Sequence, residues 1–289
     1  IEAEGIGDLI NSETELQRKQ AIKFAQGRAS NYYNNLREKL IKSLAYIEAK
    51  IDFAEDDLPD SILKKVQKSI KEVHSDIKRI LEDHKVGEKI RNGFIVSIIG
   101  EVNAGKSSLL NLLSKREVAI VSTEEGTTRD IIEVYLNIDG YPIILTDTAG
   151  IRNSKNDVEK KGILLAMKKS KDADLNIVLI DNSSSDVDIK VKNLINDNSI
   201  IVLNKSDVMN EKNHNFKEAI LISVKENKNI DQLIKKIKER LSKKTTTSFD
   251  VLVTRARHRE KLKACLNEID SFLKKDQNKN IEIAAEDLR

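Results

Sequence analysis

The sequence predicts an α/β domain inserted into a helical domain, and three successive patterns lead to this expectation. Apolar residues near the N-terminus recur at three- and four-residue spacing, which is typical of amphipathic helices. From Gly93 onwards, short runs rich in Ile and Val are separated by helical segments, as in a sheet with mainly parallel strands. Helical spacing then returns near the C-terminus. We therefore expect residues 1–88 and 247–289 to form one discontinuous helical domain around an α/β domain at 89–246.

The first part of the helical domain is expected to contain long helices with one apolar face each. Pro59 stands between Asp and Ser residues at 57–61 and separates two of them, because proline fits a first helical turn and Asp or Ser can cap it. The two apolar faces are Leu36, Leu40, Ile41, Leu44, Ile47 and Ile51, and Ile62, Val66, Ile70, Val73, Ile77 and Ile80.

Six apolar runs are expected to be the strands of a Rossmann-like sheet. Asp139-Gly140 joins the second run to the third, and this dipeptide favours a two-residue hairpin because its positive φ angles match the strand twist. Those two strands should be antiparallel at one edge of an otherwise parallel sheet. The runs are Phe94–Ile99, Ile131–Ile138, Ile143–Thr146, Leu175–Ile180, Ile200–Leu203 and Ala219–Ser223.

Composition narrows the class of protein. The 289 residues include no run of the ~18 apolar residues that a membrane span needs and no secretory signal. The single Cys265 indicates a reducing compartment, so we expect a soluble cytoplasmic protein, with this thiol in a helical core rather than at an active site. A net charge of +3 is too small to predict nucleic-acid binding by long-range electrostatics. The missing N-terminal Met predicts a piece of a longer polypeptide.

A phosphate-binding loop is expected at Gly100–Ser107, which fits the pattern GxxxxGK[ST] between a strand and a helix. Glycines let backbone amides approach phosphates, and Lys106 can reach the β and γ oxygens. Ser107 can ligate Mg²⁺. The loop residues expected to bind GTP are Asn103, Ala104, Gly105, Lys106, Ser107 and Ser108.

Two further stretches are expected to sense the γ-phosphate. Asp147-Thr148-Ala149-Gly150 follows the third strand, where Asp147 would hold the Mg²⁺ shell and the Gly150 amide would contact the γ-phosphate. The polar segment 122–130 lies between the first helix and the second strand, as a nucleotide switch does, and Thr127 and Thr128 within it would contact the nucleotide, with Thr128 as a second Mg²⁺ ligand. A plain exposed loop is the alternative for this segment.

Recognition of guanine is expected from Asn204-Lys205-Ser206-Asp207, which follows the fifth strand at the ligand-binding edge of the sheet. Asp207 can accept two hydrogen bonds from N1–H and the 2-amino group of guanine, whereas adenine would leave the carboxylate unpaired. Asn204 can address the other edge of the base and support the loop. Ser223-Val224-Lys225, after the sixth strand, would complete the base pocket through a backbone amide.

The sequence alone does not identify the residue that positions the water for attack on the γ-phosphate. Ile151 directly follows Gly150, where Ras has a water-positioning Gln, so hydrolysis needs another residue. Glu159 lies nearby, but the sequence alone leaves it equally well explained as a solvated helix start.

The stretches GEVNAGKSSLLN, EGTTRD, DTAGIR and NKSD, set between helical segments, resemble the MnmE (TrmE) family of tRNA-modification GTPases. The flanks LQRKQAIKFAQGRAS and VTRARHREKLKACL extend the resemblance over essentially the whole chain. It implies a Ras-like GTPase domain in which K⁺ replaces an arginine finger and supports pairing of two GTPase domains. It also implies that Glu159 is the catalytic acidic residue. The implied K⁺ ligands are Asn103, Ser122, Glu124 and Thr127.

The resemblance further implies a role in carboxymethylaminomethylation of the tRNA wobble uridine, with a flavoprotein partner of the MnmG (GidA) family. The family's N-terminal folate-binding domain and its C-terminal Cys tail have no counterpart in the sequence. A ribosome-assembly RNA-binding switch like Era or EngA is the alternative, although neither a KH-like domain nor a second GTPase unit is expected after residue 249. A nucleotide-binding scaffold with negligible turnover is a third reading.

Overall fold

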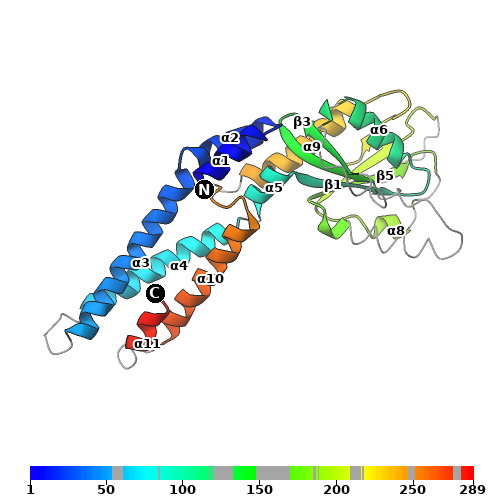
Figure 1. Cartoon of the computed structure of the whole chain (residues 1–289). Coiled ribbons are helices and arrows are strands. Elements are labelled where there is room, and N and C mark those ends of the chain that lie inside the picture. Colours follow the sequence, from blue (N-terminus) through cyan, green and yellow to red (C-terminus); the bar gives the residue numbers. More distant parts are fainter. Residues whose placement is uncertain are drawn as a thin grey trace, which may run out of the picture. The chain divides into compact units, whose positions relative to one another are not determined.

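The computed structural model describes residues 1–53, 61–83, 85–116, 118–119, 133–147, 170–184, 187, 189–208, 216, 218–246, 251–275 and 281–289. The chain divides into two compact units (Figure 1). The helical unit comprises Ile1–Ser12, Arg18–Arg91 and Ser248–Arg289, and the α/β unit comprises Glu13–Gln17 and Asn92–Thr247. Within the described residues, no helix is long and apolar enough to cross a membrane.

The helical unit is built from segments at both ends of the chain. Its elements are α1 (Glu2–Ile10), most of α2 (Glu15–Ala25), α3 (Arg28–Asp52), α4 (Ser61–Leu81), α5 (Val86–Asn92, of which Asn92 groups with the α/β unit), α10 (Ala256–Lys274) and α11 (Ile281–Glu286). The N-terminal and C-terminal segments are joined by contacts that include the following two. The Tyr33 hydroxyl donates a hydrogen bond to the Leu252 carbonyl at 2.7 Å. Gly87 packs so closely that a Cβ atom there would lie 2.1 Å from the Val253 carbonyl oxygen.

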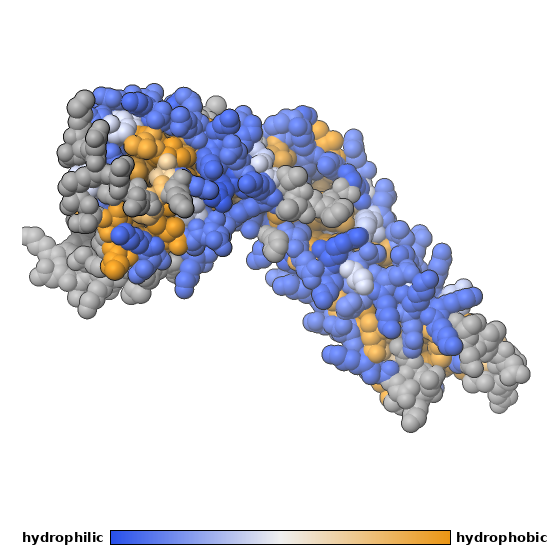
Figure 2. All heavy atoms as spheres, turned by 180° about the vertical axis from the view of Figure 1, so that it is seen from behind, coloured by the Kyte–Doolittle hydropathy of each residue, from blue (hydrophilic) through white to orange (hydrophobic). Residues whose placement is uncertain are grey.

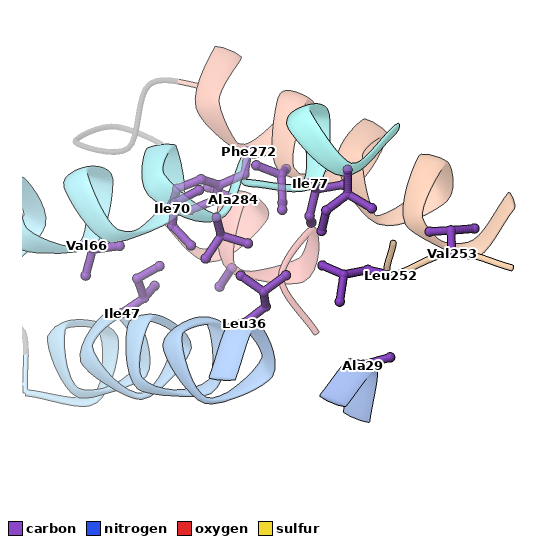
Figure 3. Packing of buried hydrophobic residues seen from close by; sticks show 14 of the residues in the cluster. Ala29, Leu36, Ile47, Val66, Ile70, Ile77, Leu252, Val253, Phe272 and Ala284 are labelled. Atoms are coloured by element: carbon purple, nitrogen blue, oxygen red, sulfur yellow. The ribbon is translucent and has the colours of Figure 1, made fainter. Parts of the chain in front are cut away.

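The core of the helical unit lies between α3, α4 and α10 (Figure 3). Ile70 and Val73 of α4 are fully buried, and Ile47 of α3 and Phe272 of α10 are 1% exposed. These positions belong to apolar stripes with helical spacing, so each helix buries one face and leaves the opposite face in solvent. Hydrophilic residues accordingly cover most of the visible surface of this unit in Figure 2. Cys265 packs against this core, and burial raises the pKa of its thiol, as expected of a structural cysteine.

The α/β unit contains a mostly parallel sheet with the order β2-β3-β4-β1-β5-β6-β7. Its strands are β1 (Phe94–Gly100), β2 (Val118–Ala119), β3 (Glu133–Ile138), β4 (Tyr141–Asp147), β5 (Leu175–Asp181), β6 (Ser199–Asn204) and β7 (Ile220–Leu221), and its helices are α6 (Lys106–Arg116), α8 (Ile189–Lys192) and α9 (Ile230–Thr246). The predicted fold class is confirmed. Among the described residues the sheet has seven strands rather than the predicted six, because β2 has only two residues and is too short to form an apolar run.

The antiparallel edge also agrees with the prediction. β3 pairs antiparallel with β4 through the hairpin at Asp139-Gly140, whose φ angles are 51° and 90°. β1 pairs parallel with β4 and β5, and β6 pairs parallel with β5 and β7. The carboxyl ends of these parallel strands meet at one edge of the sheet. That edge therefore brings together the residues that follow β1, β5 and β6.

Candidate functional site

The loop between β1 and α6 has a backbone shape that requires small residues. Gly100 and Gly105 have φ angles of 150° and 97°, and Asn103 has a φ of 63°, a region that asparagine tolerates better than most residues. A Cβ atom on Gly100 would lie 2.0 Å from the carbonyl oxygen of Leu179, and one on Gly105 would lie 2.5 Å from Nδ2 of Asn204. Both glycines of the GxxxxGK[ST] pattern are thus required by close approach as well as by φ.

The same loop leads into the N-terminus of α6, which begins at Lys106. Backbone N–H groups in the first turn of a helix can bind an anion, and the helix dipole favours negative charge there. Lys106 Nζ donates hydrogen bonds to the carbonyl oxygens of Gly100 at 3.1 Å and Glu101 at 2.5 Å. Its cationic group is therefore held at the mouth of the loop. Ser107 and Ser108 are exposed beside it.

Asn204, at the end of β6, connects three separate stretches of the chain. Its side chain is buried, with 3% of the residue exposed. Nδ2 donates a hydrogen bond to the Ala104 carbonyl at 2.8 Å, and Oδ1 accepts one from the Val224 amide at 3.1 Å. One amide group thus fixes the phosphate loop, the NKSD stretch and the Ser223–Lys225 stretch relative to one another.

Asp207 is oriented by the stretch that follows β7. The buried Ser223 hydroxyl donates a hydrogen bond to Asp207 Oδ1 at 2.7 Å and accepts one from the Glu226 amide at 3.1 Å. The Ser223 hydrogen bond is the main reason that the pKa of Asp207 lies below its ordinary value. Asp207 is therefore an ionised acceptor at neutral pH, and it suits a pair of N–H donors on a purine.

Asp181 belongs to this edge of the sheet although sequence reasoning did not select it. It ends β5 directly opposite Asn204 of β6. Its Oδ2 lies 2.5 Å from Lys205 Nζ, and its Oδ1 accepts hydrogen bonds from the Ser183 amide at 2.9 Å and the Ser183 hydroxyl at 2.6 Å. Burial opposes ionisation of Asp181, but the hydrogen bonds from Lys205 and Ser183 outweigh it and hold the pKa below its ordinary value.

Several expected site residues lie outside the described part of the chain. Asp147 ends β4 at the same sheet edge, but only its backbone is described. The others are Ser122, Glu124, Thr127, Thr128, Gly150 and Glu159. The structure thus brings together the stretches expected to bind phosphate and to recognise the base, while the two stretches expected to sense the γ-phosphate remain expectations.

The described residues include no group of three or more His, Cys, Asp or Glu side chains that could hold a metal ion. Two oxygen-bearing side chains at the phosphate loop nevertheless suit hard cations. Ser107 presents an exposed hydroxyl on the first turn of α6, and Asn103 presents an exposed amide. Neither could retain a cation alone, but each could complete the shell of one held by phosphate oxygens, as Mg²⁺ is in nucleotide sites.

The whole chain is similar to a known protein family. The family model described as MnmE helical domain matches residues 1–289. The tRNA modification GTPase MnmE of Pelagibacter ubique is 54% identical over 295 residues, covering 100% of this chain and 66% of that protein. The protein of the same name from Rickettsia bellii is 42% identical over 294 residues, covering 99% and 65%. The chain therefore spans about two thirds of the length of these curated relatives.

Among solved structures, Aquifex aeolicus Era bound to GDP and AlF4⁻ is similar to part of the chain. The sequence identity is 29% and the TM-score is 0.39, and the match covers 50% of this chain and 56% of Era.

Proposed function

Because this chain belongs to the MnmE helical domain family, we propose that it binds GTP and hydrolyses it to GDP and phosphate. The observation that carries the proposal is the buried Asn204 side chain, which bonds to Ala104 and to Val224. It holds a phosphate-binding loop and a purine-binding loop at a fixed separation. Such an arrangement fits a ligand with a base at one end and phosphates at the other.

The phosphate end of this site carries positive charge and N–H donors that favour binding of a polyanion. The first turn of α6 offers backbone amides, and Lys106 is held beside them by loop carbonyls. Ligand phosphate oxygens would replace those two neutral carbonyls as acceptors for Lys106, and an ionised acceptor makes a stronger hydrogen bond to an ammonium group than a neutral one does. The same cation then faces the oxygens on which negative charge grows during phosphoryl transfer.

The base end of the site favours guanine. Asp207 is ionised and held by Ser223, so its carboxylate offers two acceptors in a fixed direction. Guanine presents two adjacent donors, whereas adenine presents none at the matching positions and would leave the charge unpaired. This difference selects GTP over ATP.

Mg²⁺ and K⁺ are the cations that this site would use. Ser107 fits a place in the Mg²⁺ shell, with Asp147 and Thr128 as the further proposed contributors, and Asn103 fits a place beside K⁺. Bound cations of this kind supply positive charge at the β and γ phosphate oxygens. The remaining proposed K⁺ contacts are Ser122, Glu124 and Thr127.

We further propose that the chain acts in the cytoplasm in carboxymethylaminomethylation of the tRNA wobble uridine. Curated relatives carry the name tRNA modification GTPase. A flavoprotein of the MnmG family and the tRNA itself are the proposed partners, and two GTPase domains are proposed to pair during hydrolysis. The guanine-nucleotide binding on which these proposals depend is tested by calorimetry of the chain with GDP and with ADP in the presence of Mg²⁺. Binding of GDP alone is expected, and equal binding of ADP would contradict it.

GTP turnover should be faster in K⁺ than in Na⁺ at equal ionic strength, by about tenfold, because a suitably sized cation beside Asn103 stabilises charge at the phosphates. The measurement is phosphate release at several protein concentrations, so that it also reports pairing of GTPase domains. Asn103→Ala should reduce the difference between the two salts. Equal rates in K⁺ and Na⁺ for the unchanged chain would exclude the potassium role.

Glu159→Ala should retain GDP affinity and lose about 100-fold in GTP hydrolysis, the usual contribution of a residue that positions or activates the attacking water. Glu159→Gln is the informative companion, because it keeps the size and removes the charge. Single-turnover hydrolysis separates this chemical step from binding. Unchanged GTP turnover in both variants would show that Glu159 has no role in hydrolysis.

A further inference from the structure

Lys205 occupies an unusual backbone conformation in the base-recognition loop. Its φ angle is 66°, in the left-handed region that a residue with a Cβ and a long side chain seldom adopts. Such a conformation persists only where neighbouring groups determine it. The next residues along the chain are Ser206 and Asp207, so the conformation of Lys205 sets the direction in which Asp207 points.

The group that faces the Lys205 ammonium is the carboxylate of Asp181. The two side chains meet at 2.5 Å, and they are 35% and 15% exposed respectively, so solvent screens the pair only in part. Asp181 is itself fixed from two sides. Its Oδ1 accepts hydrogen bonds from both the amide and the hydroxyl of Ser183. The backbone directly after β5 is also held against β6, because the Asn182 amide donates a hydrogen bond to the Asn204 carbonyl at 2.9 Å.

We propose that Asp181 is a positioning residue for guanine-nucleotide binding, which it supports by holding Lys205 and thereby the loop that carries Asp207. This inference rests on the proposed binding of GTP. It assigns to Ser183 the supporting role of holding Asp181. Asp181 does not contact the nucleotide in this scheme, so it should affect binding much more than the chemistry of hydrolysis.

The test compares Asp181→Asn with Asp174→Asn in the full 289-residue chain. Asp174 lies just before the other end of β5, where its carboxylate accepts a hydrogen bond from the Ile95 amide at 3.0 Å. The chemical change is the same, but Asp174 precedes the first residue of β5 and so lies at the opposite edge of the sheet. Asp181→Asn should weaken binding of a fluorescent GDP analogue about tenfold, at the lower end of what a hydrogen bond to a charged group contributes. Asp174→Asn should leave binding within twofold.

Two readouts separate positioning from a general structural defect. Asp181→Asn should raise the KM for GTP about tenfold and change kcat by less than about threefold. A double-mutant cycle with Lys205→Met should show that Asp181→Asn has no further effect once Lys205 is replaced. Ser183→Ala is a milder second variant, expected to weaken GDP binding about threefold, and it keeps the test valid if Asp181→Asn does not fold.

The possible outcomes are distinct. If the unchanged chain binds no guanine nucleotide, the proposed function fails and this inference fails with it. If the unchanged chain binds GDP while Asp181→Asn and Ser183→Ala bind it equally well, only the positioning role is overturned. An equal tenfold loss in the Lys205→Met background would also overturn it, because Asp181 would then act independently of Lys205.

Discussion

Replacing Asp207 by Asn is expected to lower the affinity for GDP by about 1,000-fold, the largest effect on binding that we expect from any single residue of the site. The carboxylate offers two charged acceptors to N1–H and the 2-amino group of guanine, whereas a carboxamide offers one neutral acceptor and places an N–H group against a donor. Xanthosine diphosphate carries an oxygen in place of the 2-amino group and would pair with the carboxamide. The preference between the two nucleotides should therefore invert, as competition against a fluorescent GDP analogue would measure.

Asp139→Asn is the matched control for this experiment. The same replacement of Asp by Asn is made here at the hairpin between β3 and β4, where Asp139 pairs with Lys238 on the surface. That hairpin lies at the opposite end of β4 from the sheet edge that we propose binds the nucleotide, and asparagine accepts the φ of 51° found there. Nucleotide affinity should be unchanged in this variant. A similar loss in both variants, or a retained preference for GDP in Asp207→Asn, would remove Asp207 from base recognition.

The sequence was most informative where local chemistry determines the structure. The parallel strands are continuous apolar runs because both faces of the sheet are covered, and the hairpin at Asp139-Gly140 follows from the φ angles that those two residues accept. β2 escaped notice because Val118–Ala119 is a strand only through its pairing with β3. A two-residue element carries no periodicity of its own, so only the tertiary structure reveals it.

The candidate site also contains some residues that local sequence indicates and one that only the tertiary structure reveals. The phosphate loop and the NKSD stretch each carry their chemistry within a few consecutive residues, so spacing alone indicates them. Asp181 contributes through a partner 24 positions away, and it stands at the end of a run that otherwise reads only as a buried strand. A charged residue that ends a parallel strand was nevertheless a signal, because carboxyl ends of such strands gather at the ligand edge.

The helical unit contains a residue whose role could not be inferred from spacing. Arg259 lies on α10 among polar residues that suggest a solvated face, yet its side chain is 6% exposed. It donates hydrogen bonds to Glu88 Oε1 at 2.6 Å, to Asp83 Oδ1 at 2.6 Å and to the Leu81 carbonyl at 3.0 Å. These partners lie on α5, in the turn before it and at the end of α4. Arg259 therefore ties α10 to the connection between α4 and α5.

Arg259→Met is expected to lower the free energy of unfolding of the helical unit by about 3–5 kcal/mol, the loss typical of breaking a buried ion pair from one side. Methionine fills part of the volume but leaves the carboxylates of Asp83 and Glu88 largely buried, at 11% and 14% exposure, without their cation. The cost of those uncompensated charges exceeds the net value of the original pair, because an intact buried pair repays only part of its own desolvation.

Urea unfolding followed by circular dichroism measures this loss, and Arg79→Met is the matched control in the same unit. Arg79 pairs with Asp76 and with the Tyr32 hydroxyl on the surface of α4, where its side chain is 63% exposed. Water replaces those partners readily, so the unfolding midpoint should move little. Equal shifts in the two variants would mean that Arg259 contributes no more than a surface pair. A triple replacement of Arg259, Asp83 and Glu88 by apolar residues should recover most of the loss, since it removes the buried charges together with their partner.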